Sequence, residues 1–277
     1  MNITRLGFIS NSAMKSLVAK LRYQRASRLL RQFDTSPFVA QQQAAFERLG
    51  LNWEMSLLAV ARFFESRNEV RRDTSQHWEV AAGVVLAGGV SRILEIGTER
   101  GQFTAFLQSL DSGLEITTVD LPSSNERYLT ATTAGRADVK NELSAIQSTV
   151  AERRQNIDHL EKVRFWEMNS VRLALVEEKF DFVFVDGDHT YPVVAIDAIN
   201  AVRLVQPAGW ILFDDLISER RVASEYGGAE STRIVNVLEE SGVVSVTRFH
   251  KRLEAPKLID EVDRKYIALA RRNSTAL

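Results

Sequence analysis

Two carboxylates and an imidazole lie close together in the segment Asp186-Gly187-Asp188-His189. This segment follows residues 180–185, a mostly apolar, aromatic and β-branched run. Such a run that stops at Asp-Gly is typical of a buried strand that ends in a loop. Ligands of an open α/β sheet bind at the carboxyl ends of its strands, and histidine is the side chain best suited to exchange a proton near neutral pH. The loop is therefore our first candidate for chemistry.

A second acidic site follows the next predicted strand. Residues 206–209 read as a turn, residues 210–213 as a strand, and the pair Asp214-Asp215 ends that strand. Neighbouring strand ends would then bring three carboxylates together in a partly dry cleft, where they remain ionised only if a cation lies among them. Oxygen ligands suit Mg²⁺ or a similar hard divalent ion. The sequence thus predicts a cation at this edge of the sheet.

A glycine-containing turn precedes these elements in the chain. The sequence Gly97-Thr98-Glu99-Arg100-Gly101 joins a predicted strand, Arg92–Ile96, to a predicted helix, Gln102–Leu110. Such a turn lets the backbone approach a ligand, and the helix N-terminus presents free N–H groups. The next predicted strand, 114–119, ends in Asp120, where an acidic residue could hold the two hydroxyls of a ribose.

The spacing of the glycines argues against NAD as cofactor. The dinucleotide fingerprint is G-x-G-x-x-G, and this chain has Glu99 and Gln102 where the second and third glycines should be. The pattern Glu-x-Gly-x-x-x-Gly followed by an acidic strand end resembles motifs I and II of class I S-adenosylmethionine-dependent methyltransferases. A structural glycine turn in another α/β fold is the alternative. The resemblance implies S-adenosylmethionine as cofactor, and implies as its binding residues Glu95, Gly97, Thr98, Gly101 and Asp120, with Asn169 and Ser170 beside the adenine.

The acidic segments resemble a narrower group. Asp186-Gly187-Asp188-His189 with a later acidic pair is similar to the Mg²⁺-dependent O-methyltransferases of macrolide sugars and to the related cephalosporin-hydroxylase-like proteins, over residues 92–217. The resemblance implies Asp186, Asp214 and Asp215 as Mg²⁺ ligands and, as catalytic residues, His189 for the general base with Asp186 beside it. Catechol-type O-methyltransferases typically use a lysine as base, and the sugar-modifying group more often has Glu-Asp where this chain has Asp214-Asp215.

The chemistry that follows is methyl transfer to oxygen. A hydroxyl bound to Mg²⁺ has a lowered pKa, and a neutral His189 could take its proton as the oxygen attacks the sulfonium methyl. The alternative for the loop is structural: its carboxylates would stabilise the strand–helix junction, and we assign Asp188 to capping the next helix.

Composition limits the other function classes. The chain has 277 residues, 45% of them hydrophobic, which can fill a sizeable core. Its 35 Lys and Arg residues nearly balance 36 Asp and Glu residues, so nothing global indicates nucleic acid or an anionic membrane as partner. The absence of cysteine excludes a disulfide framework or thiolate metal site. With no run near the ~20 apolar residues of a membrane span, we expect a cytoplasmic protein that acts on a small molecule.

The order of elements predicts a Rossmann-like α/β fold with a seven-stranded, mostly parallel sheet and an antiparallel last strand. We divide the chain into a helical N-terminal segment, 1–75, and a cofactor-binding domain, 76–277, with a helical insertion at about 122–161. A basic amphipathic helix is predicted over 12–33, and one or two helices over 38–67, whose large apolar residues would serve as core or as homo-oligomer contacts. Further expected helices span 80–87, 148–160, 172–178, 193–205 and 232–240, and expected strands span 163–168, 243–249 and 265–270.

The predicted function is therefore an O-methyltransferase for a hydroxyl of a small molecule such as a glycoside, a polysaccharide precursor or a natural product. The rival from another class is a binding or scaffold protein that has the same fold and recruits a partner through its N-terminal helices.

Overall fold

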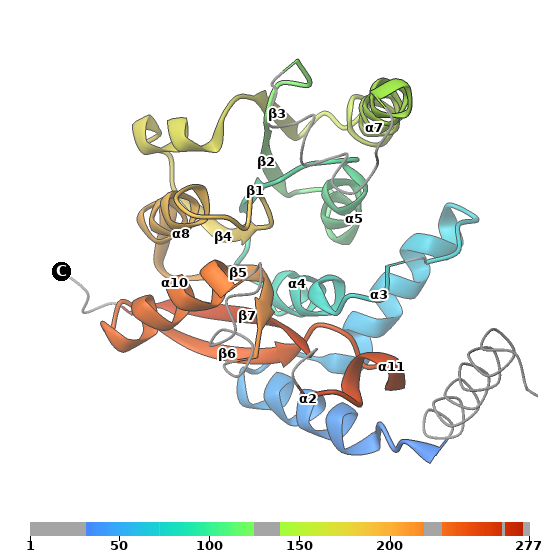
Figure 1. The fold of residues 1–277 in the computed structure, drawn as a ribbon, viewed down its shortest axis with the longest axis vertical. Helices are drawn as coiled ribbons and strands as arrows, with labels where there is room; N and C mark the ends of the chain where they lie inside the picture. The colour runs from blue at the N-terminus through green and yellow to red at the C-terminus, as the bar shows by residue number, and fades with distance from the viewer. Residues whose placement is uncertain (1–31, 72, 125–138, 219–228, 262–263, 274–277) are drawn as a thin grey trace, which may run out of the picture.

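The fold is a sheet of seven strands with helices on both faces (Figure 1). The computed structural model describes residues 32–71, 73–124, 139–218, 229–261 and 264–273. Most of the basic helix predicted over 12–33 lies outside these residues. The strands are β1 (Arg92–Ile96), β2 (Glu115–Asp120), β3 (Val163–Glu167), β4 (Phe180–Val185), β5 (Val205–Ile217), β6 (Val244–His250) and β7 (Lys265–Arg272).

The strand order is β3-β2-β1-β4-β5-β7-β6. Strands β1 to β5 are all parallel to one another, whereas β7 lies between β5 and β6 and is antiparallel to both. This topology confirms the predicted fold class. Because β6 runs in the same direction as β5, its carboxyl end lies at the same edge of the sheet as the carboxyl ends of β1 and β4.

The helices form two layers. In Figure 1, α4, α5 and α7 lie on one side of the sheet, and α8 and α10 lie on the other. The helical elements are α2 (Ser36–Arg48), α3 (Trp53–Ser66), α4 (His77–Leu86), α5 (Gln102–Leu110), α7 (Val139–Ile157), the 3₁₀ turn η1 (Ser170–Leu175), α8 (Val193–Leu204), α10 (Ala229–Glu240) and α11 (Ala255–Leu258).

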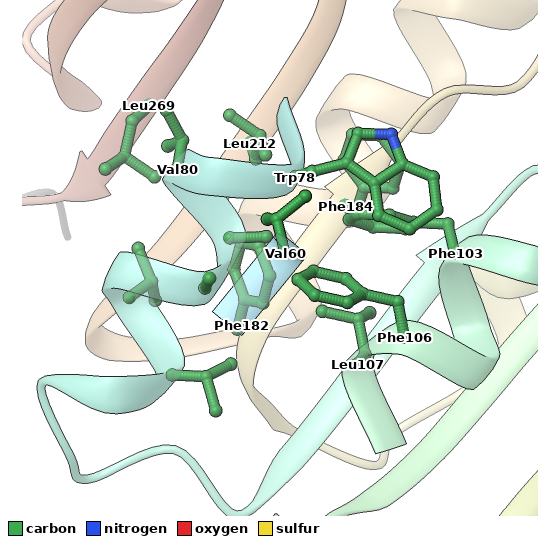
Figure 2. Close-up of a cluster of buried hydrophobic side chains, with 14 of the residues drawn as sticks. Val60, Trp78, Val80, Phe103, Phe106, Leu107, Phe182, Phe184, Leu212 and Leu269 are labelled. Carbon is green, nitrogen blue, oxygen red and sulfur yellow. The ribbon is translucent and has the colours of Figure 1, made fainter. Parts of the chain in front are cut away.

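The central strands are buried on both faces, which explains their nearly continuous apolar sequences. Ile93 of β1 belongs to the core beneath α4 and α5, and its neighbour Leu94 belongs to the core beneath α8 and α10. The first core is rich in aromatic side chains from α4, α5 and β4 (Figure 2). Trp78 lies between Phe103 and Phe106, with ring centroids 5.1 and 4.9 Å away.

The N-terminal helices α2 and α3 share that first core. Phe46 of α2 is fully buried and packs edge-to-face against Phe249 of β6 at 5.4 Å. The expectation that the large apolar residues of 38–67 form core is confirmed for Trp53, Val60, Phe63 and Phe64, which are buried. Leu57 and Leu58 are 40% and 41% exposed, so contact with a second copy stays a prediction, as does the boundary at 75/76.

Three predicted elements differ from the structure. The predicted turn 206–209 lies within β5, where the register against β4 shifts between Phe180 and Phe182, so the strand continues through it as an irregular segment. The helix predicted over 172–178 is the 3₁₀ turn η1, too short to continue because the chain becomes extended at Val176. The helix predicted over 148–160 is the second half of the longer α7.

Candidate functional site

The glycine turn and the Asp186 loop are in direct contact. A Cβ atom added to Gly97 would lie 2.2 Å from the backbone oxygen of Asp186, and Gly97 has φ +105°. Backbone hydrogen bonds fix both segments: Gly97 N–H donates to Val119 O and Asp186 N–H donates to Ile96 O, each at 2.9 Å. The parallel pairing of β1 and β4 therefore brings the predicted cofactor turn against the predicted catalytic loop.

Glu95 and Thr98 lie beneath this turn. Glu95 is 1% exposed, and its Oε2 accepts hydrogen bonds from the hydroxyls of Thr104 and Thr118. Thr98 shares a hydrogen bond of 2.6 Å with Thr118. Burial raises the pKa of Glu95 to about 8, although the threonine hydrogen bonds oppose this. Both side chains thus support the turn from below, so contact with a ligand would come from the backbone of Thr98.

Asp120 marks the other side of the turn. Its Oδ2 accepts from Glu99 N–H and its Oδ1 from Leu121 N–H, both at 2.8 Å. Burial raises the pKa of Asp120 to about 6, while these backbone hydrogen bonds and the Arg153 guanidinium, 3.6 Å away, lower it. Gly101, in the left-handed region at φ +67°, begins α5 without a side-chain cap. A carboxylate and the N-terminus of a helix therefore lie at one edge of the turn.

Asn169 and Ser170 follow β3, the strand next to β2. Asn169 Oδ1 accepts a hydrogen bond from Val171 N–H and so starts η1. The two residues thus lie at the sheet edge that also carries Asp120, on the side away from Asp186.

His189 lies between two carboxylates. Its Nε2 is 3.4 Å from Asp186 Oδ1 and 3.8 Å from Asp215 Oδ2, and its side chain is 30% exposed. Burial lowers the pKa of His189, but the hydrogen bond to Asp186 and the surrounding carboxylates outweigh it, so the pKa is raised. Burial, together with Asp214, raises the pKa of Asp186 to about 7. The structure therefore brings the predicted base and its carboxylate together at an accessible position.

Two lysines that sequence reasoning missed complete this cluster. Lys251 Nζ donates to Asp214 Oδ2 at 2.7 Å and to Asp215 Oδ1 at 2.5 Å. Lys265 Nζ contacts both carboxylate oxygens of Asp215 at 3.0 Å. Burial raises the pKa of Asp215, and the two ammonium groups outweigh it, leaving that pKa well below its usual range. The signal available in the sequence was position, since Lys251 follows the predicted strand 243–249 and Lys265 begins the predicted strand 265–270.

The two aspartates occupy a β-bulge of β5. Phe213 pairs with Ala268 and Leu216 with Tyr266, so two residues of β5 oppose one residue of β7. Asp215 has φ +55°, a conformation that few non-glycine residues adopt. The sequence correctly places the pair at the edge of the parallel sheet, but β5 does not end there.

The predicted capping role of Asp188 needs a correction. Its Oδ1 accepts hydrogen bonds from Thr190 N–H at 2.9 Å and from the Thr190 hydroxyl at 2.6 Å. Helix α8 begins after Pro192 and has no side-chain cap. Asp188 therefore stabilises the turn before the helix, because two residues separate Thr190 from the first helical turn.

A buried histidine that the sequence did not reveal lies on the inner side of the cluster. His77, at the start of α4, has its Nδ1 2.7 Å from Ser75 Oγ and 3.9 Å from Asp214 Oδ2. Burial lowers its pKa to about 4, although the nearby carboxylate of Asp214 opposes this. Sequence spacing gave no signal for this contact, which depends on how α4 packs against β5.

As arranged, the cluster does not fit the predicted Mg²⁺ ion. Within the described ranges, no group of three or more acidic, histidine or cysteine side chains is placed to hold a metal. One oxygen of each β5 aspartate is directed at Lys251, and only Asp214 Oδ1 is buried without a partner. The structure thus differs from the expected ion with Asp186, Asp214 and Asp215 as ligands, because an ammonium group lies where oxygens of Asp214 and Asp215 converge.

Comparisons with known proteins concern the fold. Residues 94–216 match the family model described as a methyltransferase domain. The chain is similar to an O-methyltransferase from Bacillus cereus solved with S-adenosylhomocysteine, with a TM-score of 0.50 and 18% identity over 87% of this chain and 100% of that chain. It is also similar to a protein from Klebsiella pneumoniae, provisionally assigned as an O-methyltransferase, with a TM-score of 0.51 and 16% identity over 86% and 99% of the two chains. At such identities the likeness shows a shared fold. No curated protein matches.

One further feature concerns membranes. Among the helices of the described residues, none is long and apolar enough to cross a bilayer.

Proposed function

We propose that the chain is a class I S-adenosylmethionine-dependent methyltransferase that acts on a hydroxyl of a small molecule. The methyltransferase-domain model matched over residues 94–216 and the fold shared with solved O-methyltransferases support this proposal. The observation that carries the proposal is the contact between the Gly97 turn and the Asp186 loop. Because His189 lies in that loop, 3.4 Å from Asp186, it would be close to a cofactor bound at the turn. A glycoside, a polysaccharide precursor or a natural product is the class of acceptor proposed.

The residues of the turn fit the cofactor. When bound, S-adenosylmethionine supplies a methyl group on a positively charged sulfur. The backbone at Gly97 and Gly101 would lie along its methionine part, because a glycine turn between a strand and a helix lets the main chain approach a ligand closely. Asp120 would accept hydrogen bonds from the ribose hydroxyls, and Asn169 and Ser170 would border the adenine.

His189 is proposed as the general base. The hydroxyl oxygen of the acceptor forms a bond to the methyl carbon while the sulfur–carbon bond breaks, and the hydroxyl proton moves to His189. Asp186, 3.4 Å from the imidazole, then stabilises the imidazolium that forms. Holding the acceptor in line with the sulfur–carbon bond would supply a further part of the rate.

No step of this mechanism passes through a metal ion. Assistance by Mg²⁺ was predicted from the resemblance, but the contacts of Lys251 with Asp214 and Asp215 do not fit an ion at that place. The deprotonation of the acceptor is therefore assigned to His189 alone.

Calorimetry with S-adenosylmethionine and S-adenosylhomocysteine tests the cofactor. We expect both to bind saturably to the wild-type protein, and the same titration should weaken clearly in Asp120→Ala. If neither compound binds below millimolar concentration, the methyl transfer proposed here does not occur in this site.

Replacement of the base tests the chemistry. In His189→Ala we expect release of S-adenosylhomocysteine to slow by about 10²–10⁴-fold with any hydroxyl acceptor that the wild type methylates, because a positioned base typically contributes that much. Its affinity for S-adenosylhomocysteine should stay within about twofold, since the imidazole does not hold the cofactor. His159→Ala, a change at an exposed histidine beyond the end of α7, is the control. An unchanged rate in His189→Ala would remove His189 from the mechanism.

A further inference from the structure

Lys251 is held in place by the backbone on both sides. Its N–H donates to Lys265 O at 2.9 Å, and its carbonyl oxygen accepts from Gln76 N–H at 2.8 Å. The residue is 8% exposed. The start of β7 and the start of α4 thus fix this lysine at the carboxyl end of β6, and its side chain does not move freely over the surface.

The ammonium nitrogen occupies the place that a cation would take. Asp214 Oδ2 and Asp215 Oδ1 converge on Lys251 Nζ at 2.7 and 2.5 Å. Oxygen ligands lie about 2.3–2.6 Å from Ca²⁺ and about 2.0–2.1 Å from Mg²⁺. A metal ion bound between the same two oxygens would compete with this ammonium group, because both would take these oxygens as partners at similar distances.

The two aspartates of β5 are also paired without a metal. Their carboxylates meet two ammonium groups in ion pairs: Lys251 with both Asp214 and Asp215, and Lys265 with Asp215. A divalent cation would bring two further positive charges beside a buried ammonium group, and like charges in a partly dry site repel strongly.

From these contacts we propose that Lys251 is the resident cation of the carboxylate cluster, so that the wild-type chain binds no divalent ion there and removal of the ammonium group creates a metal site. The Lys251 ammonium group pairs with Asp214 and Asp215 as a covalently attached charge. The cation of the cluster is therefore present at any concentration of free metal. The proposal concerns cation binding and stands apart from methyl transfer.

The test is the binding of Mn²⁺, used as a paramagnetic probe for Mg²⁺-type sites, measured by electron paramagnetic resonance and calorimetry without cofactor or acceptor. We expect no saturable binding to the wild type and saturable binding to Lys251→Ala. The affinity of the variant should be at least about tenfold tighter than the weakest affinity that the titration can detect. The second change Asp214→Asn in the Lys251→Ala protein should abolish the gain. Lys265→Ala is the matched control, because it removes an ammonium group from the same aspartate, Asp215, and leaves Lys251 in place.

Folding is followed by circular dichroism in each variant. Lys251→Gln, which keeps a hydrogen-bond donor and loses the charge, replaces Lys251→Ala if that protein does not fold, and the same gain is expected. Two results would overturn the proposal: saturable Mn²⁺ binding by the wild type that Asp214→Asn removes, or folded Lys251 variants that bind Mn²⁺ no better than the wild type. Binding of S-adenosylhomocysteine, measured in parallel, reports on the proposed methyltransferase function separately.

Discussion

Replacing Gly97 with alanine should be among the most destabilising single changes in the protein. The backbone conformation at φ +105° costs a residue with a side chain about 1–3 kcal/mol. The new Cβ would also lie 2.2 Å from Asp186 O, far inside normal contact, so the two segments must separate. Separation breaks the hydrogen bonds from Gly97 to Val119 and from Asp186 to Ile96, each contributing about 1 kcal/mol. Together these terms predict a loss of about 3–5 kcal/mol.

Urea denaturation of wild type, Gly97→Ala and Gly88→Ala measures this loss. Gly88 has a comparable φ of +87° but nothing within 4 Å of an added Cβ, so its replacement should cost only about 1–2 kcal/mol. The difference between the two variants isolates the close approach of the turn to the Asp186 loop. Equal losses in the two variants would show that the approach is not tight and would weaken the argument that places His189 beside the cofactor turn.

Two further predictions concern the docking of α2 against β6. Phe46→Ala should lower the free energy of unfolding by about 3–5 kcal/mol, because Phe46 is fully buried against Trp53 and Phe249. The control Leu57→Ala, at a 40% exposed position, should cost less than about 1 kcal/mol. Equal denaturation midpoints for the two variants would contradict this packing. Burial and then Arg264 lower the pKa of His250 to about 4, so the folded state binds fewer protons than the unfolded chain and stability should rise with pH between about 4 and 6.5, by up to about 3 kcal/mol. His250→Phe should reduce that rise, leaving the part that the buried His77 contributes, and an unchanged slope would show that His250 does not cause it.

The fold could be predicted because the burial of its strands is visible in their apolar sequences. Residues buried on both faces form short apolar runs, and the bounds of β1 and β4 follow directly from where those runs begin and end. The turn expected over 206–209 failed for a physical reason. Pro207 and Gly209 have turn chemistry, and Ala208 has φ +59°. Because β4 pairs with Val205 before this segment and with Trp210 after it, the segment remains within β5 as an irregularity and does not separate two elements.

The carboxylates of the site could be predicted from the sequence, whereas the ammonium groups beside them could not. A recognisable strand precedes each of the three carboxylates, Asp186, Asp214 and Asp215. Their position at one edge of the sheet can therefore be inferred from the neighbouring sequence alone. Lys251 and Lys265 come from the antiparallel hairpin at the far side of the sheet, and their contact with Asp215 depends on β7 lying between β5 and β6. Charge alone did not distinguish these two lysines from the other six lysines in the chain.

The bulge in β5 explains how two adjacent aspartates can share one partner. Neighbouring side chains of a regular strand point to opposite faces, so Asp214 and Asp215 could not both reach Lys251 from an unbroken β5. The extra residue opposite β7 and the positive φ of Asp215 turn both carboxylates to the same nitrogen. Because β5 then pairs with β7 as far as Ile217, the lysine at the start of β7 also contacts Asp215. The extension of the sheet and the charge pairing of the site are therefore one structural feature, and we expect a change that removed the bulge to disturb the contact of Asp215 with His189.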